Sequence, residues 1–102
     1  MTEKPFHWPG RRAADPAHEM MAAFLVMDIQ HNSQWAREVA ERIQKIRSGN
    51  LSGWERIGNA YRLELTATSA LIEDLVDEDA PAQTVALEEF AAAVDAWMEA
   101  IC

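Results

Sequence analysis

The sequence predicts an α+β domain with an N-terminal helical hairpin, a small three-stranded antiparallel β-meander, and a C-terminal amphipathic helix packed on the sheet. Apolar residues recur at helical spacing in the first half of the chain and again at its end. Between these regions, from residue 54, they alternate with polar residues at the period of a strand. The 102 residues suffice for one core and are too few for two, so residues 1–102 are expected to form a single domain.

Residues 1–14 are expected to form a flexible arm, because Pro5, Pro9 and Gly10 interrupt any regular structure there. Trp8 lies within this arm. Its side chain either latches the arm onto the body of the protein or anchors a partner, and the sequence leaves both open.

The first helix is expected over Ala17–Gln30, where Asp15 caps it and Pro16 occupies its first position. Its apolar run is continuous, which favours burial, and a buried strand over Phe24–Ile29 is the alternative. A second helix should run from a cap at Ser33 to about Arg47, and the pair should form an antiparallel hairpin. One apolar face of the second helix carries four residues that we expect in the core: Trp35, Val39, Ile43 and Ile46.

Three strands are expected next, over Trp54–Ile57, Tyr61–Ala67 and Ala70–Val76. A short helix over Leu71–Val76 is the alternative for the third. An acidic loop over Asp77–Gln83 should then lead to a helix capped near Thr84. The apolar stripe of that helix is predicted to cover the sheet and consists of Leu87, Phe90, Val94, Trp97 and Ile101.

The charge is distributed unevenly along the chain. The formal net charge is −8, yet every Lys and Arg lies at or before Arg62. The later residues carry ten acids: Glu64, Glu73, Asp74, Asp77, Glu78, Asp79, Glu88, Glu89, Asp95 and Glu99. This distribution disfavours direct binding of nucleic acid or anionic lipid and favours a basic protein partner. Solubility alone would also explain an acidic surface.

Residue chemistry predicts neither an enzyme nor a cofactor or metal site. The three histidines and Cys102 lack the spacing of metal ligands, and the serines lie at expected caps and turns. The single cysteine and the absence of a signal-peptide pattern favour a cytoplasmic protein. The longest apolar run, Met20–Met27, is too short to span a membrane. A monomer or a weak homodimer is expected, the latter through residues 20–27 and Trp35.

Residues 54–65 contain a recognisable pattern: Trp54, three residues, Gly58-Asn59, then Tyr61, Leu63 and Leu65 at alternate positions. Together with the segment Ala70–Leu75 and the closing helix, this order resembles the CdiI-type immunity proteins of contact-dependent growth inhibition. It is similar, more distantly, to the YacL-like small proteins. The resemblance implies an immunity protein that binds and neutralises a toxin domain, often a nuclease, at the C-terminus of a large CdiA-like protein.

Under this hypothesis, the acidic surface covers the basic cleft of the toxin. The residues predicted to bind the partner, chosen for charge and expected exposure, are Glu64, Glu73, Asp74, Asp77, Glu78 and Asp79. The alternative function is a small acidic cytoplasmic adaptor or regulatory protein whose basic protein partner is not a toxin.

Overall fold

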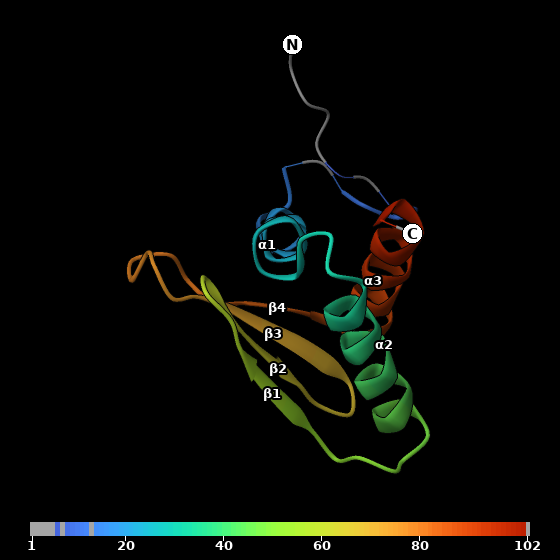
Figure 1. Cartoon of the computed structure of the whole chain (residues 1–102). Helices are drawn as coiled ribbons and strands as arrows, with labels where there is room; N and C mark the ends of the chain where they lie inside the picture. The colour runs from blue at the N-terminus through green and yellow to red at the C-terminus, as the bar shows by residue number, and fades with distance from the viewer. Residues whose placement is uncertain (1–5, 7, 13, 102) are drawn as a thin grey trace.

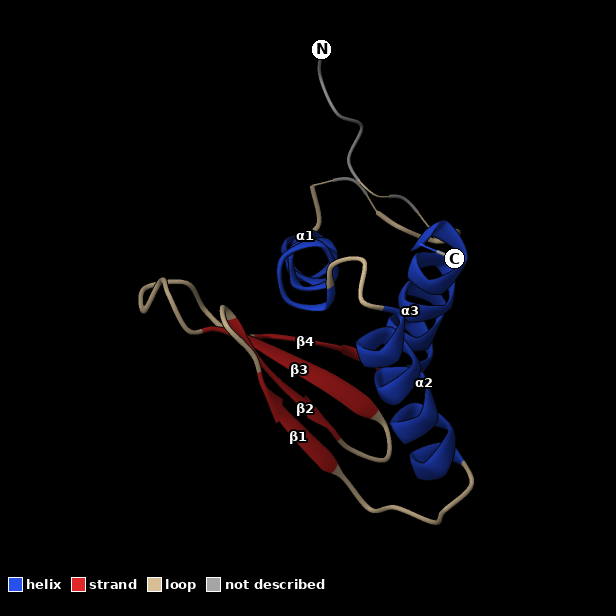
Figure 2. Ribbon diagram, viewed as in Figure 1, coloured by secondary structure: helices blue, strands red, loops and turns tan. Residues whose placement is uncertain are grey.

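A four-stranded antiparallel sheet carries three helices on one of its faces (Figures 1 and 2). The computed structural model describes residues 6, 8–12 and 14–101. The elements, in chain order, are α1 (Pro16–Phe24), the π-helix η1 (Leu25–Ile29), α2 (Ser33–Arg47), β1 (Trp54–Ile57), β2 (Tyr61–Leu65), β3 (Ser69–Asp74), β4 (Gln83–Ala86) and α3 (Leu87–Ile101). The predicted α+β class is therefore correct, although two details of the architecture differ.

The first difference is a fourth strand. The strands lie in the order β1-β2-β3-β4, each antiparallel to the next. β4 pairs with β3 in the register Ala70↔Val85, so Thr84 belongs to a strand and does not cap the last helix. The four residues of β4 are buried on one side only, at Val85, which leaves a pattern too short to stand out beside the acidic loop. The third strand is β3, and the alternative helix over Leu71–Val76 is wrong.

The second difference concerns the helices. Helix α2 packs mainly against α3, whereas α1 lies across the sheet and contacts β3, β4 and α3 (Figure 1). The predicted hairpin of the first two helices is therefore wrong. The chain bends sharply between them at Gln30, whose φ of 57° is unusual for a residue with a side chain. The bend is held by Trp97, whose Nε1–H donates a 2.7 Å hydrogen bond to the Gln30 carbonyl.

Helix α1 begins as predicted. Asp15 is its N-cap and accepts hydrogen bonds from the backbone N–H groups of Ala17 and His18, and Pro16 follows at the first position. The helix continues as η1, so the alternative strand over Phe24–Ile29 is wrong. Asn32, not Ser33, caps α2 by accepting from the Trp35 N–H.

The core lies between the sheet and the helices. Strand residues that face inward alternate with exposed ones, so β2 buries Tyr61, Leu63 and Leu65. The last helix places Phe90 and Trp97 in this core, as predicted. Trp35 is 40% exposed, so its predicted place in the core is wrong. It lies at the first turn of α2, and the buried face of that helix is completed by Ala36 instead.

Part of the N-terminal segment packs on the body. Trp8 is 5% exposed, and Phe6 contacts Trp97 edge-on with ring centroids 4.8 Å apart. Trp8 therefore takes the latching role. The rest of the arm predicted over residues 1–14 is only partly described, since residues 1–5, 7 and 13 lie outside the described residues, as does Cys102.

Candidate functional site: an acidic and apolar surface at the turn end of the sheet

A buried carboxylate organises one end of the sheet. Asp28, in η1, is 1% exposed and accepts two hydrogen bonds of 2.9 Å from the backbone N–H groups of Ala60 and Tyr61. Ala60 lies in the turn between β1 and β2, and Tyr61 is the first residue of β2. A buried charge is tolerated only where such donors satisfy it, so Asp28 fixes η1 to the turn.

Gly58 allows this approach. A Cβ atom built on Gly58 would lie only 2.8 Å from the Asp28 Cγ and 2.6 Å from the Arg56 Nη1. The Gly-Asn step in the pattern that begins at Trp54 therefore has a structural explanation. Gly58 makes room for the carboxylate that holds the turn.

Arg56 links this carboxylate to helix α2. Its Nη1 atom lies 3.9 Å from the Asp28 Oδ2 atom, and its guanidinium carbon lies 5.5 Å from the centre of the Trp35 ring. The side chain is 15% exposed, and its positive charge lies between the Asp28 carboxylate and the face of the Trp35 ring. The start of α2 is thereby brought to the same end of the sheet.

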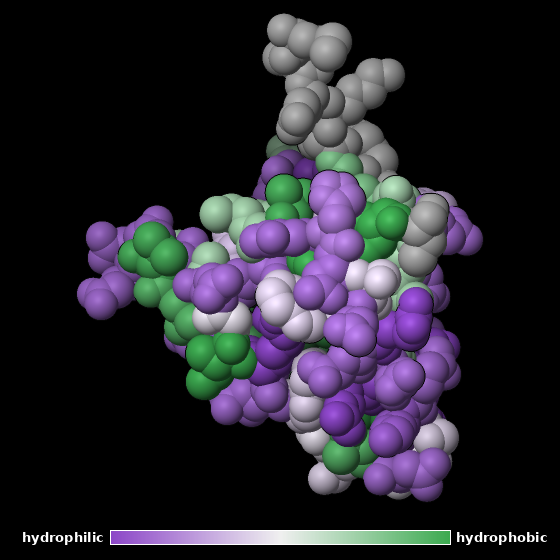
Figure 3. Space-filling view, in the orientation of Figure 1, coloured by the Kyte–Doolittle hydropathy of each residue, from purple (hydrophilic) through white to green (hydrophobic). Residues whose placement is uncertain are grey.

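Exposed apolar side chains surround this end. The Leu75 N–H donates a 2.8 Å hydrogen bond to the Ala60 carbonyl, which places the end of β3 beside the same turn. The exposed large apolar residues of the described chain are Val26, Met27, Trp35, Ile57, Leu75 and Val76. We call these six residues, with the adjoining acids Asp77, Glu78 and Asp79, the turn-end surface. Figure 3 shows hydrophobic atoms beside hydrophilic ones at this end, where the loop between β3 and β4 projects.

The acidic loop holds its shape through its own backbone. Asp74 Oδ1 accepts from the N–H groups of Val76 (2.8 Å) and Asp77 (2.9 Å), and Asp77 Oδ1 accepts from Asp79 N–H. The side chains of Asp77, Glu78 and Asp79 are exposed. Among the described residues, no Lys or Arg lies within ion-pair distance of these three carboxylates.

Two of the predicted partner-binding residues lie in a different setting, on the solvent-facing side of the sheet. Arg62 Nε lies 2.9 Å from Glu73, and Arg62 Nη1 lies 2.6 Å from Glu55 and 4.0 Å from Glu64. Hydrogen bonds to Glu73 and then Glu55 raise the pKa of the Arg62 guanidinium. The charges of Glu73 and, more weakly, Glu64 are thus partly compensated, whereas those of the acidic loop are not.

The six predicted residues therefore fall into two groups. Glu64 and Glu73 belong to the Arg62 network, Asp77, Glu78 and Asp79 lie in the loop, and Asp74 ends β3 where it caps the loop backbone. Sequence reasoning considered residues 20–27 and Trp35 only as a homodimer surface and missed the exposed side chains of Ile57, Leu75 and Val76. One signal was present: the run Met20–Met27 has apolar residues on all sides, so a helix packed on one side must expose some of them.

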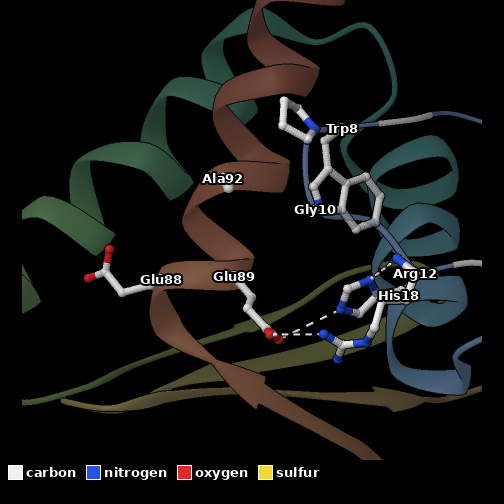
Figure 4. Close-up of a pocket in the computed structure, with 8 residues that line it drawn as sticks. Trp8, Gly10, Arg12, His18, Glu88, Glu89 and Ala92 are labelled. Carbon is white, nitrogen blue, oxygen red and sulfur yellow. Dashed lines mark hydrogen bonds and ion pairs between the residues drawn. The ribbon is translucent and has the colours of Figure 1, made fainter.

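A second cluster lies under the N-terminal segment, around a hollow of about 400 Å³ (Figure 4). His18, 1% exposed, accepts a 2.9 Å hydrogen bond at Nδ1 from the Arg12 backbone N–H. Its Nε2 atom points toward Glu89, with 3.6 Å between Nε2 and Oε2, and Trp8 covers the ring. Glu89 also lies 3.5 Å from the Arg12 guanidinium.

This arrangement suits a latch better than a catalytic site. The Arg12 N–H occupies the lone pair of His18 Nδ1, and Nε2 has no hydrogen-bond partner among the described residues. In the described part of the chain, no group of three or more His, Cys, Asp or Glu residues is placed to hold a metal ion.

The fold and this surface define a small α+β protein whose most distinctive feature is an acidic, apolar end. A family model matches residues 11–102, and the family is described as the uncharacterised protein family UPF0231. The chain belongs to this family. No curated protein and no solved structure matches it. Within the described residues, no helix has the length and apolar character needed to cross a membrane.

Proposed function

We propose that the protein acts in the cytoplasm by binding a basic protein partner, and that this partner is a toxin domain which the protein neutralises. The observation that carries the proposal is the acidic loop. Three exposed carboxylates without an ion-pair partner in the described structure adjoin exposed Leu75 and Val76. Such a surface attracts a basic protein and offers apolar contact once the two have met.

The toxin hypothesis adds a mechanism to this surface. A nuclease holds its phosphate substrate in a cleft lined with Lys and Arg. The projecting loop could enter such a cleft with its carboxylates in place of phosphates and exclude the nucleic acid. As an inhibitor of this kind, the protein needs no catalytic group of its own. The toxin part of the proposal is supported by the resemblance of residues 54–97 to immunity proteins.

The second candidate is an adaptor or regulatory protein with a basic partner that is not a toxin. The same loop supports it, because charge selects a partner by its sign and not by its activity. Gene order separates the two. An immunity gene should lie directly downstream of a reading frame that encodes a toxin.

The deciding experiment is a co-expression rescue. The domain encoded immediately upstream is expressed alone, then with this protein, and surviving cells are counted. Killing that co-expression relieves would support immunity, and a variant carrying Asp77→Asn, Glu78→Gln and Asp79→Asn should relieve it less. A harmless upstream product, or killing that this protein does not relieve, would reject the toxin hypothesis and leave the adaptor.

A further inference from the structure

We propose that the turn-end surface is a two-part docking site for a partner that presents an apolar side chain flanked by Lys or Arg. The inference rests on the proposed function and deepens it by naming the surface and the chemistry of the segment that binds there. The apolar residues would bury the apolar side chain of the partner, and the acidic loop would attract the partner's Lys or Arg and so select it by charge.

The apolar half is concentrated and rigidly held. All six large apolar residues that are exposed in the described chain belong to it, with exposures from 40% at Trp35 to 76% at Val76. They come from four segments that a few interactions tie together: the two Asp28 hydrogen bonds, the Leu75–Ala60 hydrogen bond and the Arg56–Trp35 contact. A preformed apolar surface loses little conformational entropy on binding.

The same place departs from ordinary folding rules in three ways. The helix widens to a π-helix, a carboxylate is fully buried beneath it, and apolar residues face solvent beside it. π-helical segments are rare and are frequently found at functional sites. Departures from local rules are expected to gather where function constrains the sequence, which supports a binding role for this end.

Charge decides what covers the surface. In a symmetric dimer through this patch, the acidic loops of both copies would lie at one interface, where like charges repel. The nearby cations cannot offset them, because Arg56 lies against Asp28 and Trp35, and Arg62 is held by glutamates. A basic partner removes this repulsion, so we assign the surface to a different, basic protein and not to a second copy.

The test is a titration of the ¹⁵N-labelled full chain, followed by amide chemical shifts, with three short synthetic peptides. The first places Leu and Trp between lysines, the second replaces Leu and Trp with Ser, and the third replaces the lysines with Glu. We expect saturable shifts at the residues of the turn-end surface, 26–27, 35, 57 and 75–79, with the first peptide. The other two should bind at least about tenfold more weakly, since each lacks one half of the required chemistry.

Variants locate the effect. The double variant Met27→Ser with Val76→Ser should bind the first peptide about tenfold more weakly, because it removes apolar contact area from the turn-end surface. Both side chains are exposed, so the fold should stay intact. Ala92→Ser with Ala100→Ser is the matched control and should bind as the wild type does, because both residues are exposed on α3, which contributes no residue to the turn-end surface (Figure 1).

Several outcomes would overturn the inference. Shifts outside the turn-end surface, no saturation, or equal binding of the acidic peptide would each reject it. Shifts that change with protein concentration in the absence of peptide would assign the surface to a second copy instead. Failure of the rescue with a positive peptide result rejects only the toxin hypothesis. If the variant with Met27→Ser and Val76→Ser still rescues cells as well as the wild type does, only the docking surface is rejected.

Discussion

The buried position of Asp28 depends on the absence of a side chain at Gly58. The carboxylate satisfies two backbone donors of the turn, and the absence of a side chain at Gly58 leaves the space it occupies. Each substitution should therefore destabilise the protein by a different route. Asp28→Ala strands a buried N–H at Tyr61, and Gly58→Ala forces the carboxylate away from its donors.

This pair predicts a non-additive mutant cycle. Asp28→Ala alone should lower the free energy of unfolding by about 2–4 kcal/mol, and Gly58→Ala alone by about 1–3 kcal/mol. In the Asp28→Ala background, Gly58→Ala should have a much smaller further effect, because the carboxylate it would displace is gone and only Arg56 Nη1, at the end of a flexible side chain, must still move. Urea unfolding of the four proteins measures the coupling. Effects that simply add would show that the two residues act independently.

The two tryptophans of the N-terminal half should behave in opposite ways. Trp8 is 5% exposed and packs against His18, so Trp8→Ala should destabilise the fold by about 3 kcal/mol. Trp35 is 40% exposed, so Trp35→Ala should change stability by less than about 1 kcal/mol.

Binding should reverse this order. Trp35→Ala should weaken binding of the lysine-flanked Leu-Trp peptide, because Trp35 belongs to the turn-end surface, while folded Trp8→Ala should bind it unchanged. Urea unfolding and peptide titration of both variants provide the comparison. Equal effects of the two substitutions in either measurement would contradict the roles assigned to them.

At the scale of elements, Asp15 makes the stability of α1 depend on pH. The pKa of the Asp15 carboxyl is lowered below its ordinary value of 3.8. The largest cause is the hydrogen bond from the His18 N–H, and hydrogen bonds from the Arg12 side chain and the Ala17 N–H add to it. A carboxyl with a lowered pKa stabilises the folded state when ionised. This contribution is complete above about pH 5 and is lost as the pH falls through the lowered pKa.

Asp15→Asn should therefore flatten the acid limb of the stability curve. Asparagine still caps the helix through its side-chain oxygen but does not titrate. Below pH 4 or thereabouts, the midpoint of thermal unfolding should fall less steeply with pH in the variant than in the wild type. Parallel curves from pH 6 to 2.5 would mean that other carboxyls dominate, and Asp95→Asn, an exposed acid of α3, serves as the control.

The elements also show how far the sequence could be interpreted. Periodicity predicted the three helical segments and strands β1–β3, because each buries one face that repeats over several residues. It could not predict the partner of α2, since an apolar stripe indicates burial but not which element covers it. Strand β4 offers four residues and one buried side chain, which is below what periodicity resolves. Asp28 gave no signal either, because its partners are backbone groups 32 and 33 residues away.

Across the whole molecule, the position of the charges matters more than their sum. Asp77→Asn, Glu78→Gln and Asp79→Asn together change the formal net charge from −8 to −5, as Glu41→Gln, Asp95→Asn and Glu99→Gln also do. All six residues are exposed, so neither triple variant should disturb the fold. Asn at position 77 keeps the acceptor that the Asp79 N–H uses.

The two triple variants should differ in how they bind the lysine-flanked peptide. At low salt, the loop variant should lose about tenfold in affinity and most of its salt dependence, because the lost charges adjoin the docking site. The control variant should lose less than about twofold, since its charges lie on α2 and α3 and not in the acidic loop. Titrations at two salt concentrations compare the slopes. Equal losses in the two variants would mean that net charge attracts the partner and that the acidic loop has no special part in recognition.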